Sequence, residues 1–238
     1  PPYDIISEKQ RLDYINENEY NIIRLELPKD GENPYQNASD ILNMWRDKGI
    51  LIHEDKPAIY IYEEEFNAYS ERKSIKGIIA RVKLEEFSKG IILPHEFTLS
   101  KAKEDRFNLM KATNCNFSQI YALYMEEKHV TLKTIDECSK CTPELEFTDS
   151  DDVTHRLWIV TDEEIINKLV DDFAHRRLYI ADGHHRYETA LNYRNYCREN
   201  GISKEGDAQD YQMIYLVDMD HPGLVVFPTH RLVRDLPD

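Results

Sequence analysis

The sequence is poor in cysteine, in positive charge and in long apolar runs. Four cysteines in 238 residues are too few for the disulfide framework of small secreted domains. The 45 acidic residues outnumber the 30 lysines and arginines, and the formal net charge of −15 argues against nucleic acid as the main partner. No run is long enough to cross a bilayer, and no signal segment opens the chain. We therefore expect a cytoplasmic protein with no membrane partner.

Several catalytic signatures are also missing. No GxxxxGK[ST] loop is present, which argues against a P-loop nucleotidase, and no GxGxxG follows an expected strand, which argues against a Rossmann cofactor site. GxSxG and HExxH are absent as well. The pair Cys138 and Cys141 has the spacing of half a zinc site, which His129 or His155 would have to complete. Without a second such pair, a surface turn with two thiols is the simpler interpretation.

What is present indicates a globular chain with ample core, since 41% of the residues are hydrophobic and 32% charged. Strands and helices are interspersed, so we predict one α+β domain over 1–238, a mixed sheet with flanking helices, with a weak candidate boundary at the acidic stretch 144–152. Expected strands are 20–28, 58–63, 75–84, 118–126, 153–160, 178–181, 212–218 and 224–227; expected helices are 37–49, 101–112, 184–200 and one capped by Thr161 that runs to Phe173.

The most informative stretch runs from Leu178 to Glu188. It predicts a short strand, a tight turn at Asp182-Gly183 and a helix that begins near His184. Free backbone N–H groups and the helix dipole favour an anion at such a helix start. His185 and Arg186 can both donate hydrogen bonds to phosphate oxygens, and Asp182 can cap the helix or hold a metal. A polar helix start would need only one such residue, so we predict a phosphate site.

Two further constellations place histidine beside a charged residue. In the loop after residue 93, His95 precedes Glu96, a pair that can supply a general base and the group that orients it. Arg106 follows about two turns into the next helix and is expected to face the same pocket. His230 and Arg231 follow the last apolar run, and loops at the ends of strands often carry functional residues. The alternative interpretation of His95 and Glu96 is a loop whose histidine bonds to the backbone, and that of His230 and Arg231 is a solvated loop.

Taken in order, these motifs resemble one family. Asp182–Ala190, Pro2-Tyr3-Asp4, Pro94–Thr98 with Asp105-Arg106, and Thr229–Arg231 together are similar to the bacterial and archaeal family called domain of unknown function 1015. The resemblance spans nearly the whole chain. Members of that family are usually longer, which implies that this chain is an N-terminal portion.

A more distant resemblance concerns the turn alone. Gly183–Arg186 is similar to the phosphate-binding turn of the ParB/sulfiredoxin superfamily, which implies a core of that type. His184 stands where sulfiredoxins have their catalytic cysteine, so sulfiredoxin chemistry is excluded. The free serine kinases of the superfamily carry an Asp-Gly-His turn like Asp182-Gly183-His184. The resemblance therefore implies phosphoryl transfer from ADP or ATP to the hydroxyl of a small metabolite such as free L-serine.

These arguments assign a role to each candidate residue. Glu96, chosen for its setting beside His95, is the expected base. The other assignments are Asp182 and His184 as catalytic residues, Asp182 as ligand of Mg²⁺, and Gly183, His185, Arg186, His95, Arg106, His230 and Arg231 as phosphate-binding residues. The alternative is a nucleotide- or phosphometabolite-binding sensor without turnover, which would not need Glu96. A DNA partner, as for ParB itself, is a weaker third hypothesis that the net charge opposes.

Overall fold

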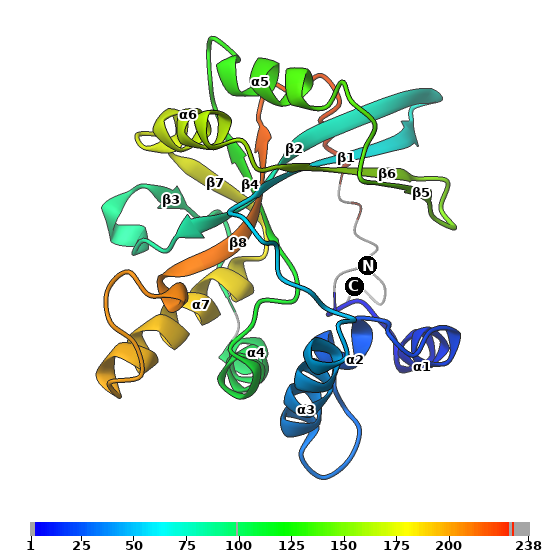
Figure 1. The fold of residues 1–238 in the computed structure, drawn as a ribbon, viewed down its shortest axis with the longest axis vertical. Coiled ribbons are helices and arrows are strands. Elements are labelled where there is room, and N and C mark those ends of the chain that lie inside the picture. Colours follow the sequence, from blue (N-terminus) through cyan, green and yellow to red (C-terminus); the bar gives the residue numbers. More distant parts are fainter. Residues whose placement is uncertain (1–2, 99, 229, 231–238) are drawn as a thin grey trace, which may run out of the picture.

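The computed structural model describes residues 3–98, 100–228 and 230, and one mixed sheet organises them (Figure 1). The eight strands are β1 Ile59–Ala68, β2 Glu71–Lys83, β3 Ile92–Leu93, β4 Ile120–Tyr124, β5 Leu145–Thr148, β6 Thr154–Val160, β7 Leu178–Asp182 and β8 Tyr211–Asp218. The α-helices are α1 Glu8–Glu17, α2 Ile23–Glu26, α3 Pro34–Asp47, α4 Ser100–Thr113, α5 Val130–Cys138, α6 Glu163–Phe173 and α7 His184–Glu199. The expected α+β class is confirmed.

The strand order is β3-β7-β4-β8-β2-β1-β6-β5. β1 and β2 form an antiparallel hairpin, with Phe66 opposite Lys73. Two pairs are parallel, β3 with β7 and β4 with β8, and these bring distant parts of the chain together. The edge strand β3 has only two residues, so a short parallel pairing places the loop that follows it beside the end of β7.

The two faces of the sheet have different neighbours. On one face, alternating residues such as Ile61, Ile120 and Ile214 pack with Ile135 of α5 and Leu169 of α6, in a core that Tyr187, Ala190 and Leu191 of α7 complete. Burying an aliphatic side chain of this size contributes about 1.5–3 kcal/mol each, so this face holds the fold together.

The opposite face carries tyrosines and looks toward the N-terminal helices. Tyr62, Tyr121 and Tyr215 come from three strands, and they line a cavity of about 850 Å³ that residues of α1 and α2 also line. Burial raises the pKa of Tyr121 to about 12, so its phenol stays neutral at ordinary pH. The helices α2, α3 and α4 have a small core of their own, and α4 packs against α7 (Figure 1).

Three local expectations are wrong. The region 20–28 forms the single helical turn α2, because the Asn21 side chain accepts a bond from the N–H of Ile23 and starts a helical turn. Residues 224–227 pair with no strand, and Val226 is 83% exposed. Asp162, and not Thr161, caps α6 by accepting bonds from the N–H groups of Glu164 and Ile165.

The remaining expected elements agree with the structure within a few residues, whereas α1, β3, α5 and β5 are not among the predicted elements. The acidic stretch 144–152 contains β5 and its turn into β6, which belong to the same sheet as the rest of the chain. In the described part of the chain, no helix combines the length and the apolar character that crossing a membrane requires.

Candidate functional site

The site begins at the turn between β7 and α7, which the sequence predicts correctly. Gly183 stands between Asp182 and His184 with a φ of +94°, in the left-handed region that favours glycine. It is the N-cap of α7, and among the described residues no side chain caps the helix there. The first intrahelical bond runs from the N–H of Tyr187 to the carbonyl of Gly183. The first N–H groups of α7 thus form the positive end of the dipole of a 16-residue helix.

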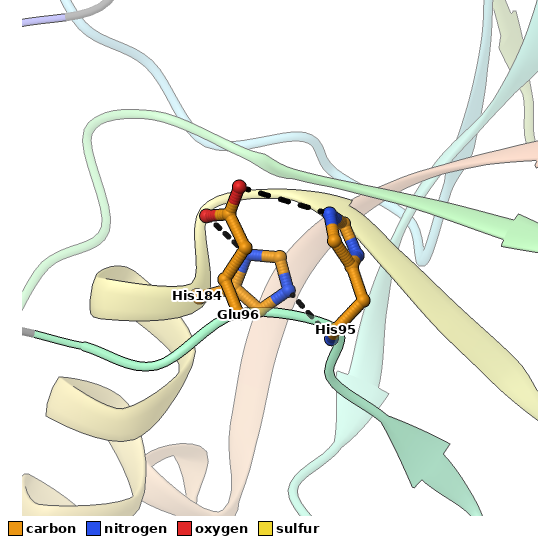
Figure 2. A group of neighbouring side chains, drawn as sticks. All are labelled: His95, Glu96 and His184. Atoms are coloured by element: carbon orange, nitrogen blue, oxygen red, sulfur yellow. Dashed lines mark hydrogen bonds and ion pairs between the residues drawn. The ribbon is translucent and has the colours of Figure 1, made fainter.

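Three side chains from two distant segments meet on one side of this turn (Figure 2). His184 is buried, and its Nε2 accepts the backbone N–H of His95 at 3.2 Å, although the residues are 89 positions apart. Its Nδ1 lies 3.6 Å from Oε2 of Glu96, and Nε2 of His95 lies 3.8 Å from Oε1 of Glu96. The two imidazole rings meet edge to face, with centroids 4.5 Å apart. We call His95, Glu96 and His184 the histidine–glutamate cluster.

The backbone fixes the tautomer of both histidines. Nδ1 of His95 lies 2.8 Å from the carbonyl oxygen of Ile180, and because a carbonyl only accepts, this nitrogen carries a proton. Nε2 of His184 accepts the N–H of His95, so the proton of a neutral His184 ring is on Nδ1, which faces Glu96. In the neutral form of both rings, His95 therefore presents a lone pair at Nε2 and His184 presents an N–H to the carboxylate.

Burial also keeps His184 uncharged. It lowers the pKa of His184, the neighbouring His95 lowers it further, and the charges of Glu96 and Asp182 oppose this only in part. The side chains of His95 and Glu96 are 58% and 63% exposed. The cluster thus combines a fixed, neutral imidazole with an accessible imidazole and an accessible carboxylate.

The other side of the turn is closed. Arg186 donates from Nη2 to Oδ2 of Asp182 and from Nη1 to the carbonyl of Gln119, both at 2.5 Å. Its guanidinium lies so close to Gly183 that a Cβ there would stand 3.0 Å from Nε. Asp182 and Arg186 line the 850 Å³ cavity. The sequence predicts both for the phosphate and metal site, and the structure places them side by side, bonded to each other.

Further along α7, Glu188 accepts hydrogen bonds of 2.6 Å from Thr98 and from Lys103. Burial raises the pKa of Glu188, but these two bonds, together with the charges of Lys103 and His185, hold it below its usual value. The bonds tie the loop that carries His95 and Glu96 to the helix. Thr98 and Lys103 are not among the residues that the sequence predicts for the site. No sequence signal distinguishes Lys103 from the other lysine at the start of this helix.

Of the other predicted phosphate ligands, Arg106 is engaged elsewhere in the fold. Arg106 is buried, donates to the carbonyl of Glu26 at 2.6 Å and stacks on Tyr3, with its guanidinium 4.1 Å from the ring centroid. It therefore fastens α4 to α2 instead of facing His95. His230 is exposed, and Arg231 lies outside the described residues.

Only one group of side chains in the described part offers three potential metal ligands within 4.8 Å of one another, and it is the histidine–glutamate cluster. Cys138 and Cys141 lie at the end of α5, where the thiol of Cys141 donates to the carbonyl of Cys138. His129 is bonded to Asp218 and His155 to Asp149, so neither completes a zinc site with the cysteines.

Comparison with known proteins gives a single family and nothing finer. No curated protein and no solved structure matches the chain. The family described as "Protein of unknown function (DUF1015)" matches residues 1–238, the whole of the sequence. The chain therefore belongs to the DUF1015 family.

Proposed function

We propose that this chain transfers a phosphoryl group from ATP or ADP to the hydroxyl of a small metabolite, with free L-serine as the first acceptor to test. The observation that carries the proposal is the position of the histidine–glutamate cluster, which lies at the start of a long helix that has no side-chain cap in the described part of the chain. A helix start binds phosphate oxygens through backbone N–H groups, and the cluster lies where a reacting group would need a base.

Glu96 is the base in this proposal, and His184 is the residue that positions it. The Nδ1–H of His184 faces Oε2 of Glu96, and the buried, neutral imidazole cannot itself carry the proton away easily. A carboxylate has about four lone-pair sites, so Glu96 can accept a hydroxyl proton while it keeps this contact. In phosphoryl transfer the protein takes little part in covalent chemistry. It acts mainly by positioning the reacting groups and by stabilising the charge on the phosphoryl oxygens.

The carboxylates beside the helix start support a nucleotide bound together with Mg²⁺. Asp182 and Glu96 would repel a bare polyphosphate at short range, and a divalent ion on the phosphates removes this repulsion. In this proposal Asp182 orients the Mg²⁺ through the carboxylate oxygen that Arg186 does not use. The distant similarity of Gly183–Arg186 to the ParB/sulfiredoxin turn, including a core of that type, stays part of the proposal.

The experiment incubates the chain with ATP or ADP, Mg²⁺ and L-serine and measures phosphoserine by mass spectrometry, followed by a panel of small hydroxy acids. We expect product with at least one acceptor. Nucleotide binding without any product would contradict the transfer reaction and would favour the second candidate, a nucleotide- or phosphometabolite-binding sensor.

The variant Glu96→Gln separates the two candidates. A transferase should keep nucleotide binding and lose product, because the amide cannot accept the proton. A sensor should bind its ligand as before, since it has no use for the base. Glu137→Gln, on the exposed surface of α5, is the matched control for a lost carboxylate.

A further inference from the structure

The geometry points to a divalent-ion site between Nε2 of His95 and the carboxylate of Glu96, suited to a transition-metal ion such as Mn²⁺ or Zn²⁺. This site is separate from the Mg²⁺ that would accompany a nucleotide, and binding of the ion does not depend on the proposed function. The position of the ion follows from which atoms of the cluster accept hydrogen bonds and which donate them.

The first step is that two acceptors face each other. The proton of the neutral His95 ring is on Nδ1, in the bond to the Ile180 carbonyl, so Nε2 presents a lone pair. The atom opposite, Oε1 of Glu96 at 3.8 Å, can also only accept. Two lone pairs directed at one space repel unless a positively charged species lies between them.

The second step is that both residues have polar partners of the kind that support metal ligands: a hydrogen bond for His95 and a polar contact at 3.6 Å for Glu96. A histidine that binds a metal almost always donates its other ring N–H to a carbonyl or carboxylate, and a ligating carboxylate is itself held by a donor. Nδ1 of His95 donates to the backbone of β7, and Nδ1 of His184 faces the second oxygen of Glu96 at 3.6 Å. These contacts hold Nε2 of His95 and Oε1 of Glu96 toward the same point (Figure 2).

The third step is the fit of an ion between them. Bonds from zinc to nitrogen and to oxygen are about 2.1 Å long, so two ligands of one ion can be at most about 4.2 Å apart. The observed 3.8 Å lies within this limit. Both side chains are more than half exposed, which leaves coordination positions for water or a ligand and leaves Glu96 free to adjust.

His184 supports this site but is not one of its ligands. Its Nε2 is engaged by the backbone N–H of His95, and a metal on Nδ1 would require both ring nitrogens to be unprotonated. The ligand set is therefore one imidazole and one carboxylate. Imidazole favours transition metals over Ca²⁺ and Mg²⁺, and the carboxylate is compatible with Mn²⁺ as well as Zn²⁺.

Where the proposed function also holds, the ion gives the site a further use. A hydroxyl that coordinates a divalent ion loses its proton more easily, and Glu96 keeps lone pairs with which to accept that proton. This last point rests on the proposed function, whereas the binding of the ion does not.

The test measures Mn²⁺ binding to the chain by electron paramagnetic resonance, and Zn²⁺ binding by competition, without nucleotide. We expect one ion per chain. His95→Ala and Glu96→Gln should each weaken binding at least tenfold, and His184→Asn should weaken it by about 10- to 100-fold as a residue that holds a ligand in place. His129→Asn, at the N-cap of α5, and Glu137→Gln, within α5, are the matched controls and should bind as the wild type does.

A second measurement protects the test from misfolded variants. In nitrogen-15 spectra of the wild-type histidines, added Zn²⁺ should shift Nε2 of His95 and leave Nδ1 of His95 protonated. The inference is overturned if Mn²⁺ does not bind up to about 1 mM, the weak end of protein ion sites, or if it binds equally to both ligand variants. Ion binding without phosphoryl transfer contradicts only the proposed function, and transfer without ion binding contradicts only this inference.

Discussion

The two sides of the first turn of α7 use the same short motif for different purposes. On one side, Arg186 is bonded to Asp182 and to the carbonyl of Gln119 at 2.5 Å, so two of its terminal nitrogens are already engaged. On the other side, His184 and Glu96 are 3.6 Å apart, and His95 and Glu96 are 3.8 Å apart. One side holds short bonds within the protein, and the other leaves donors and acceptors in reach of a ligand.

The difference shows that a charged side chain at a helix start can also be bonded within the protein. A guanidinium at a helix start is suited to phosphate, and the sequence therefore predicts one for Arg186. In the fold, this guanidinium fastens the start of α7 to the residue that precedes β4 and neutralises the carboxylate at the end of β7. In the proposed function, the imidazoles and a carboxylate from another segment would carry the chemistry.

The largest expected effect comes from a change on the open side of the turn, where His95, Glu96 and His184 lie. Glu96→Gln should lower the rate of phosphoryl transfer by about 10²- to 10⁴-fold, the usual contribution of a general base. Its free energy of unfolding should change by less than about 0.5 kcal/mol, since the side chain is exposed. Product assays and urea unfolding of the same preparation check both halves. A variant that loses stability would show that the open side also holds the fold.

The next largest effect comes from a change on the closed side of the turn, where Arg186 is bonded to Asp182. Arg186→Ala should destabilise the chain by about 2–3 kcal/mol, because it removes charge-assisted hydrogen bonds and leaves a carbonyl and a carboxylate without their partner. Urea unfolding measures the loss, and an exposed arginine or lysine changed to alanine gives the baseline. If stability is unchanged while phosphate binding disappears, the two sides have been assigned the wrong way round.

A smaller effect comes from the residue between the two sides. Gly183→Ala should cost about 1–2 kcal/mol, because the left-handed conformation is strained for a residue with a Cβ. The new Cβ would also press on Nε of Arg186. Gly201→Ala is the matched control, with a φ of +66° and no atom within 4 Å of the added Cβ. Equal melting temperatures for the two variants would contradict the contact with Arg186.

The smallest effect concerns pH. Burial lowers the pKa of His184 in the fold, so the unfolded chain takes up protons more readily. The contribution of the neutral His184 to the free energy of unfolding is complete above the pKa of this histidine in the unfolded chain, near 6.5. It is lost as the pH falls below that value. His221, whose pKa burial also lowers, contributes in the same direction. His184→Asn should lose less stability than the wild type between pH 7.5 and 5.5 in urea titrations, and an identical loss would contradict a neutral His184.

Sequence reasoning succeeded where the signals were local. The Asp182-Gly183 turn and the helix behind it follow from a glycine that tolerates positive φ and from a strand-like run before it. It failed at 20–28, where Ile22, Ile23 and Leu25 fit a strand as well as one helical turn, and the Asn21 side chain decides between them. Such short apolar runs are ambiguous by pattern alone.

The site itself was predictable only as two separate halves. His95 with Glu96 and the turn at His184 were each recognised, but their meeting depends on pairing between segments 89 residues apart. Arg106 shows the limit of helical spacing as a guide. The spacing indicated a turn position, and a contact with the Glu26 carbonyl decided the direction of the side chain.

The brevity of β3 has a consequence for how the site opens. Only two residue pairs, Ile92 with Leu178 and Leu93 with Tyr179, form the ladder between the edge strand and β7, so we expect the segment that delivers His95 and Glu96 to open more easily than the central strands. Native-state hydrogen exchange should therefore reveal two separate opening events: a low-energy release of the amides near Leu93 and a costlier opening of β4 and β8. Opening of this segment alone would admit a ligand at the edge of the sheet while the central strands β4 and β8 stay paired.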